Sequence, residues 1–125
     1  MAAAFDDVFA TLKQVFHPHL KRLDVQVDTA KEYTLVGRVP SPFKQHNGNP
    51  MFFASVRVGK AYVSFHLLPL YMNPALTATV SPALKKRMQG KACFNFKSAP
   101  DAALLADLDR LTRAGFRNFD EKHWL

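Results

Sequence analysis

The sequence predicts an α+β domain, with an antiparallel or mixed five-stranded sheet that carries N-terminal and C-terminal helices on one face. Three observations support this class. Apolar residues recur at helical spacing near both ends of the chain, several segments between them alternate with period two, and proline, glycine and asparagine separate those segments. The order of helix, strands, short helix, strand and helix favours helices gathered on one side. The other face of the sheet is then partly open.

Length and composition favour a single small domain spanning residues 1–125. A hydrophobic fraction of 48% supports one buried core. The single cysteine, Cys93, excludes an internal disulfide and is typical of a reducing compartment. The first seven residues lack the basic start of a signal peptide, and no apolar run reaches the length of a membrane helix. We therefore expect a cytoplasmic protein without a membrane partner.

The N-terminal third predicts a helix followed by a hairpin. Apolar residues from Phe5 to Phe16 lie on one helical face, and Pro18 is expected to end or kink that helix near His17. Residues 24–28 alternate in polarity, and residues 33–39 read as a second strand. The four residues between them predict a tight connection.

A second hairpin follows a loop of about ten residues, rich in proline, asparagine and glycine, between Pro40 and Pro50. Residues 52–58 and 61–67 alternate, and Gly59-Lys60 fits a two-residue type II′ turn that pairs Val58 with Ala61. Alternation then assigns one set of side chains to the core: Phe52, Ala54, Val56, Val58, Ala61, Val63, Phe65 and Leu67. The opposite face receives Phe53, Ser55, Arg57, Tyr62, Ser64 and His66.

The last third predicts a short helix, a strand and a long helix. Ser81-Pro82 is a strong helix start, and that helix is expected to reach Gln89 with Gly90 as its C-cap. Residues 91–97 alternate, with Ala92, Phe94 and Phe96 on one face.

Leucines from Leu104 to Leu111 describe the C-terminal helix. Ser98 with Asp101 predicts its N-terminal cap, and Gly115 is expected to end or weaken it.

The open face combines aromatic, cationic and hydrogen-bonding side chains on one rigid sheet. Single-stranded nucleic acid is often held by such a surface, through stacking beside cations. Tyrosine, serine and arginine are also common on exposed strands without any ligand, so both interpretations stay open. The candidate ligand-binding residues are Arg57, Tyr62, Ser64, His66, Cys93 and Asn95.

Positive charge is concentrated in the middle of the chain. The formal net charge is +7, and residues 33–100 hold nine basic residues and no acid. A surface of this kind attracts anions, although it also serves solubility. The densest group, our candidate anion-binding patch, is Lys85, Lys86, Arg87 and Lys91. Cations at the end of a helix also complement its dipole without any ligand.

Neither a catalytic centre nor a metal site is expected. Ser64, His66 and Cys93 have no acid nearby in sequence to orient a nucleophilic triad. His17 and His19 have spacing that sometimes chelates, but the remaining ligands and the usual zinc motifs are missing. The glycines form no phosphate loop or dinucleotide fingerprint. We therefore predict a protein without an enzymatic activity, a metal or a cofactor.

Several segments resemble the YdhG-like family of bacterial proteins of unknown function, grouped with the YjbR/CyaY-like, or frataxin-like, superfamily. The segments that carry the resemblance are residues 62–66 (YVSFH), 69–71 (PLY), 81–82 (SP), 84–96 (LKKRMQGKACFNF) and 115–116 (GF). The resemblance implies a TBP-like fold, in which helices flank one face of an antiparallel sheet. Frataxins bind iron on an acidic ridge along the first helix and strand edge. This chain offers only Asp6, Asp7, Asp24 and Asp28 there, so iron binding is not carried over.

Three functional hypotheses follow. The leading one is a non-enzymatic module that binds an anionic ligand or partner, with nucleic acid as one candidate. A frataxin-like metal-binding accessory protein is an alternative that rests on fold analogy alone. The third is an interaction module, such as a homodimer formed through the open face or a free strand edge, and is motivated by the expected exposure of Phe53 and Tyr62.

Overall fold

The computed structural model describes residues 2–125, with side chains from residue 5 onward. Helices and strands follow one another in the order α1 (Ala2–Lys13), η1 (Gln14–Arg22), β1 (Asp24–Asp28), β2 (Glu32–Pro40), η2 (Lys44–His46), β3 (Pro50–Val58), β4 (Val63–Leu67), α2 (Leu68–Met72), α3 (Pro74–Thr77), α4 (Pro82–Lys85), β5 (Met88–Gln89), β6 (Cys93–Phe96) and α5 (Ala102–Glu121).

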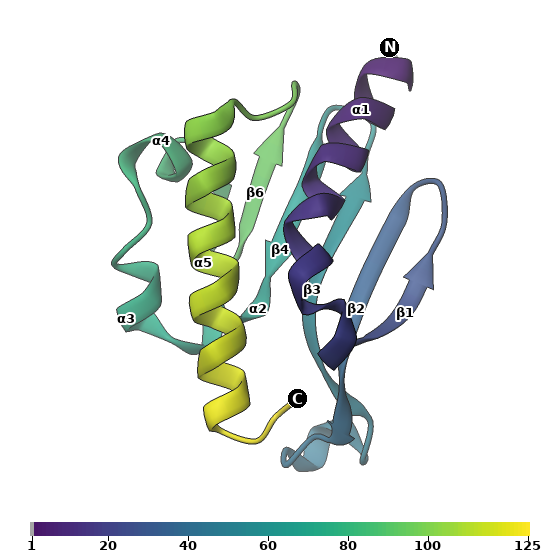
Figure 1. Cartoon of the computed structure of the whole chain (residues 1–125), viewed down its shortest axis with the longest axis vertical. Coiled ribbons are helices and arrows are strands. Elements are labelled where there is room, and N and C mark those ends of the chain that lie inside the picture. Colours follow the sequence, from purple (N-terminus) through teal and green to yellow (C-terminus); the bar gives the residue numbers. More distant parts are fainter. Residues whose placement is uncertain (1) are drawn as a thin grey trace.

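The strands form one sheet in the order β1-β2-β3-β4-β6-β5, and every neighbouring pair is antiparallel. The helices α1 and α5 both lie in front of this sheet (Figure 1). The α+β class and the antiparallel sheet with a helix at each end are therefore confirmed. The sheet has six strands rather than the expected five, because Met88–Gln89 forms the additional strand β5.

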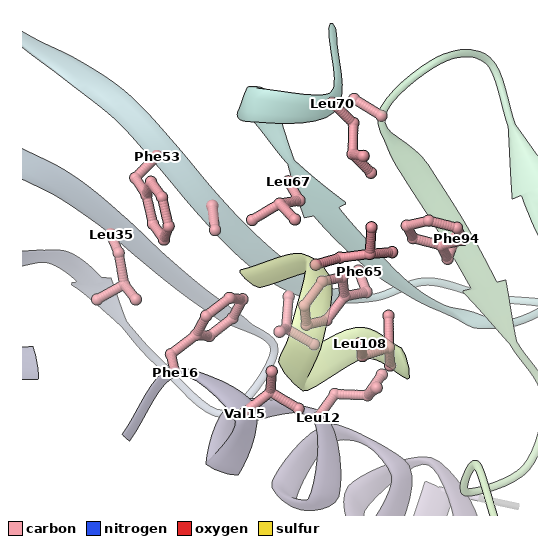
Figure 2. Packing of buried hydrophobic residues seen from close by; sticks show 14 of the residues in the cluster. Leu12, Val15, Phe16, Leu35, Phe53, Phe65, Leu67, Leu70, Phe94 and Leu108 are labelled. Carbon is pink, nitrogen blue, oxygen red and sulfur yellow. The ribbon is translucent and has the colours of Figure 1, made fainter. Parts of the chain in front are cut away.

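Large aromatic side chains fill the space between the sheet and the helices. Phe16 stacks on Phe65 with ring centroids 5.0 Å apart, and Phe65 contacts Phe94 on β6. Leu12 of α1 and Leu108 of α5 close the cluster from the helical side (Figure 2). Each of these side chains is fully buried, and burial of one such group stabilises the fold by roughly 1.5–3 kcal/mol.

The N-terminal helix ends earlier than expected. Its α-helical part stops at Lys13, and the chain continues as a 3₁₀ helix through Pro18 to Arg22. A proline ring clashes with the carbonyl four residues earlier in an α-helix, here that of Gln14, so the tighter winding avoids the clash. Val15 and Phe16 remain buried, and the apolar face continues unbroken.

A β-bulge at Phe53 reverses the faces predicted for the start of β3. Leu35 pairs with Ala54 and Val36 pairs with Phe52, so Phe53 is an extra residue on β3. Phe53 and Ala54 consequently both point into the core, whereas Phe52 lies on the open face. The assignment of Phe53 to the open face and of Phe52 to the core was wrong. One motive for a homodimer, an exposed Phe53, is thereby removed.

The second hairpin has a longer loop than predicted. Val58 pairs with Val63 rather than with Ala61, and the Gly59 amide donates to the Tyr62 carbonyl at 2.9 Å. The two-residue turn is therefore wrong. A shift of two residues leaves the β4 side chains from Val63 to Leu67 on their predicted faces, because strand side chains alternate with period two. Ala61 was predicted for the core, but it lies exposed in the loop before β4, so that assignment was wrong.

The short helix α4 begins as predicted, since the Ser81 side chain accepts a hydrogen bond from the Leu84 amide. It ends at Lys85 rather than at Gln89, because Met88 and Gln89 pair with β6. Gly90 has a φ of 74° and lies in the turn between β5 and β6 instead of capping a helix. Burial of Phe94 and Phe96 confirms the predicted alternation of the last strand.

The long helix α5 is capped by Asp101, whose carboxylate accepts from the Leu104 amide at 2.9 Å, and not by Ser98. Gly115 lies inside the helix and does not end it. A Cβ atom at this position would lie 2.8 Å from Cβ of Pro69. The glycine therefore allows α5 to approach α2 closely.

The loop after β2 and the C-terminal residues pack together at one end of the sheet. Trp124 contacts the rings of Phe43 and Phe119, and its backbone lies against Gly37. The Ser41 hydroxyl lies 2.6 Å from His46 Nδ1 and accepts from the Phe43 amide. These contacts hold the loop in place.

Among helices of the part that the structure describes, none has the length and apolar composition needed to cross a bilayer.

Candidate functional site

Polar side chains occupy the sheet face opposite α1 and α5, which we call the open face. Strand pairing places them in two rows of directly opposed residues. One row consists of Thr34, Ser55, His66, Cys93 and Gln89. The second row consists of Glu32, Arg57, Ser64 and Asn95. Five of the six candidate ligand-binding residues predicted from the sequence lie in these rows, namely Arg57, Ser64, His66, Cys93 and Asn95. The sixth, Tyr62, lies just before β4, and its hydroxyl donates a hydrogen bond to Gln89 at the end of the first row.

An open hollow of about 470 Å³ lies at the middle of this face, and we call it the central depression. Its lining residues are Gln26, Glu32, Thr34, Phe52, Ser55, Arg57, Ser64, His66 and Cys93. Thr34 Oγ1 donates to Glu32 at 2.7 Å, and Arg57 lies 3.2 Å from the other carboxylate oxygen. The Thr34 hydrogen bond is the main reason why the pKa of Glu32 lies below its ordinary value, with a smaller opposing effect of burial and a smaller lowering by Arg57. Glu32 is therefore an anion at neutral pH and balances the charge of Arg57.

Burial favours the neutral forms of His66 and Cys93, which also line the central depression. Burial lowers the pKa of His66 below 6.5, and the nearby Arg57 guanidinium lowers it further. Burial raises the pKa of the Cys93 thiol above 9.0, against a smaller lowering by Ser64. At neutral pH the depression thus offers an uncharged imidazole and a protonated thiol. The His66 ring meets the Phe52 ring edge to face, with centroids 5.2 Å apart.

A second hollow of about 410 Å³, the edge depression, lies where the β5–β6 hairpin meets the start of β4. It is lined by Tyr62, Lys86, Arg87, Met88, Gln89, Asn95 and Lys97. Asn95 Nδ2 donates to Gln89 Oε1 at 2.6 Å, and the Tyr62 hydroxyl donates to the same oxygen at 3.2 Å. Asn95 in turn accepts from the Ser64 hydroxyl at 3.0 Å. This chain of hydrogen bonds connects the edge depression to the central depression.

Ion pairing leaves the edge depression with an excess of positive charge. Arg38 pairs with Asp24 and Arg57 with Glu32, so acids from outside residues 33–100 neutralise two of the nine cations. Within residues 2–125 the other seven take part in no ion pair. Three of the seven, Lys86, Arg87 and Lys97, line the edge depression.

The predicted anion-binding patch is divided by the fold. Lys86 and Arg87 line the edge depression, and Lys85 ends α4 with its side chain exposed. Lys91 lies in the β5–β6 turn, at the opposite end of that hairpin from Arg87, and its ammonium lies 5.8 Å from the Tyr71 ring centroid. Lys97 lines the edge depression together with Lys86 and Arg87, although it was not predicted to belong to the patch.

Sequence reasoning also missed Glu32, Thr34, Phe52 and Gln89. Glu32 and Thr34 belong to the site because β2 pairs with β3. A long loop connects these two strands, so the sequence around either strand does not indicate which of their residues lie opposite one another. Phe52 depends on the bulge, and Gln89 was assigned to a helix. The sequence did offer one signal, since Glu32 and Thr34 are two residues apart and so belong to the same face of the strand.

Nowhere in the part of the chain that the structure describes do three or more His, Cys, Asp or Glu side chains form a group that would hold a metal ion. Glu32 lies in the same depression as Ser64, His66 and Cys93, but its carboxylate contacts Thr34 and Arg57.

Comparison of the chain with protein-family models, curated proteins and solved structures gives no match.

Proposed function

We propose that the chain is a non-enzymatic module that binds a phosphate-bearing anionic ligand, single-stranded nucleic acid in the first place, at the edge depression. The observation that carries this proposal is the convergence of three cations outside any ion pair of residues 2–125 with a tyrosine and two amides. Cations neutralise phosphates, and a neighbouring aromatic ring provides a surface for a base.

The chemistry of the open face supports binding rather than catalysis. A cysteine nucleophile acts as its thiolate, and burial raises the pKa of the Cys93 thiol. The Glu32 carboxylate lines the central depression together with His66, and its hydrogen-bond partners are Thr34 and Arg57. The side chains here are therefore suited to donating and accepting hydrogen bonds.

Fluorescence anisotropy with labelled single-stranded and duplex oligonucleotides at low and moderate salt tests the proposal. We expect single strands to bind with a dissociation constant in the micromolar range at low salt, and affinity to fall steeply as salt rises. The variant Lys86→Gln/Arg87→Gln/Lys97→Gln removes three phosphate partners. In a plot of the logarithm of the binding constant against the logarithm of the salt concentration, the slope for this variant should be shallower than that of the wild type by roughly 2.

A matched control removes the same charge elsewhere. Lys21, Lys44 and Arg117 are exposed, and the structure gives them no ion pair within residues 2–125. The variant Lys21→Gln/Lys44→Gln/Arg117→Gln should retain most of the binding. Equal loss in both triple variants would mean that net charge alone binds the strand, and would contradict a site at the edge depression.

We also propose that the chain is a YdhG-like protein with a frataxin-like, TBP-like fold. The support for this is the antiparallel sheet with α1 and α5 on one face together with the sequence segments named above. Alignment of YdhG-like sequences through residues 62–66 and 84–96 tests it. Charged residues at the positions of the buried Phe65 and Phe94 would contradict the assignment.

A further inference from the structure

We propose that the central depression is a nucleobase subsite, in which the Phe52 and His66 rings together form an aromatic wall for the base and the Glu32–Arg57 pair contacts its hydrogen-bonding edge. This inference rests on the proposed function, since it assigns the base of a strand whose phosphates lie at the edge depression. It gives the open face two chemically distinct halves.

The two depressions are adjacent. Ser64 lines the central depression, its cross-strand partner Asn95 lines the edge depression, and their side chains are joined by a 3.0 Å hydrogen bond. Neighbouring strands in a sheet lie about 4.8 Å apart. A phosphate held at the edge depression therefore leaves its attached sugar and base within reach of the central one.

The charges of the two halves differ. Glu32 neutralises Arg57, so the central depression has no excess positive charge for a second phosphate. The Glu32–Arg57 pair can nevertheless form further hydrogen bonds. The Arg57 side chain is 67% exposed and uses one of its nitrogens on Glu32, and each carboxylate oxygen has a further lone pair to offer. Donors beside acceptors suit the edge of an uncharged heterocycle that carries both kinds of group, as nucleobases do.

An aromatic wall stands next to this pair. The Phe52 and His66 rings meet edge to face, at an interplanar angle of 77°, and both are partly exposed. Planar bases stack on phenylalanine and histidine rings in single-stranded recognition. An uncharged imidazole, which burial favours here, adds one donor or acceptor without repelling Arg57.

Two DNA oligonucleotides of equal length can distinguish the contribution of the bases to affinity from that of the phosphates. One is a single-stranded DNA decamer of mixed sequence, and the other is an abasic decamer with the same number of phosphates. We expect wild-type protein to bind the normal decamer about tenfold more tightly than the abasic one. The variant Phe52→Leu should remove most of that difference and leave the affinity for the abasic decamer unchanged.

Glu32→Gln provides a second variant that keeps the shape of the side chain. It leaves Arg57 without its anion, so affinity for the abasic decamer should rise while the preference for bases falls. Phe43→Leu is the matched control, because Phe43 is a half-buried phenylalanine in the loop beside Trp124. Its preference for the normal decamer should remain tenfold.

Equal wild-type affinity for the two decamers would overturn the nucleobase subsite and leave the phosphate proposal intact. If neither decamer binds at low salt, the phosphate proposal fails, and adenosine and guanosine then test the subsite alone. Shifts of the Phe52 and His66 nuclear magnetic resonance signals on addition of nucleoside would support it. Unchanged signals at millimolar nucleoside would overturn it.

Discussion

Gly115 illustrates how one residue sets the distance between two elements. Glycine usually weakens a helix interior, and replacement by alanine gains about 1 kcal/mol at an unconstrained position. Here the added methyl group would meet Cβ and Cγ of Pro69 at 2.8 and 2.9 Å. The proline ring is rigid, so relief requires movement of the backbone of α2 or α5.

We therefore predict that Gly115→Ala lowers the free energy of unfolding by about 1–3 kcal/mol, the usual cost of overpacking. Urea denaturation followed by circular dichroism measures this. Ala106→Gly, at an exposed position of the same helix, gives the propensity effect alone, a loss of about 1 kcal/mol. A Gly115→Ala variant that is more stable than the wild type would show that α2 does not lie against α5 as described.

At the scale of the element, the bulge in β3 decides which of two adjacent phenylalanines belongs to the core. Phe53 is fully buried and contacts the rings of Phe116 and Phe119, whereas Phe52 lies on the open face. Simple alternation from Val56 backwards assigns them the other way round. The bulge has no signal in the local sequence, because either phenylalanine is apolar enough for the core.

The two positions should respond very differently to truncation. Phe53→Ala is expected to cost about 3–5 kcal/mol of stability because it opens a cavity among aromatic rings. Phe52→Ala should cost about 1 kcal/mol or less, as is usual for partly exposed positions. Thermal and urea denaturation of both variants measures the contrast, and a larger loss for Phe52→Ala would contradict the bulge.

Elements with strong local signals were predictable from the sequence, and those defined by long-range pairing were not. The Ser81 cap, the alternation around Phe94 and the first hairpin follow from patterns within a few residues. The strand at Met88–Gln89 and the length of the loop after Gly59 depend on partners elsewhere in the sheet. Tertiary pairing overrides local preference at such positions.

Part of the candidate site was likewise predictable from the sequence, and part of it was not. Strand parity was sufficient to place Ser64, His66 and Cys93 on one face, because a register error of two residues does not change parity. The neutralisation of Arg57 by Glu32 was not predictable, since it requires the register between strands joined by a long loop.

At the scale of the whole molecule, titratable groups limit the pH range over which the fold is stable. Burial lowers the pKa of His19 below 6.5, with a smaller raising effect of Asp109 and a smaller lowering effect of Arg113, and burial also lowers the pKa of His66. Below pH 6.5 the unfolded chain then binds more protons than the folded one. His19 stacks on Phe116, and within residues 2–125 its Nε2 has no hydrogen-bond partner, so an added proton would be buried there without an acceptor.

We predict that stability declines as the pH falls from 6.5 and again, through Glu32, below 4.5. In alkali the raised pKa values of Cys93 and Tyr33 make the unfolded chain lose protons first, so stability declines above pH 9. Urea midpoints between pH 4.5 and 10 measure this profile, which should be highest between about pH 6.5 and 9.

The histidine contribution has its own variants. His19→Gln/His66→Gln should flatten the profile between pH 6.5 and 4.5, because it removes both imidazoles whose pKa values burial lowers. An unchanged wild-type midpoint between pH 7.5 and 5.5 would show that neither buried imidazole resists protonation.

The packing of Trp124 provides the molecule with an internal optical probe. It is the single tryptophan of the chain, and its indole contacts Phe43 and Phe119. Phe43 precedes β3 and Tyr62 follows it, so the indole and the edge depression lie at opposite ends of that strand. Tryptophan emission therefore reports whether the C-terminal residues are docked on α5, and a strand bound at the edge depression should leave the emission unchanged.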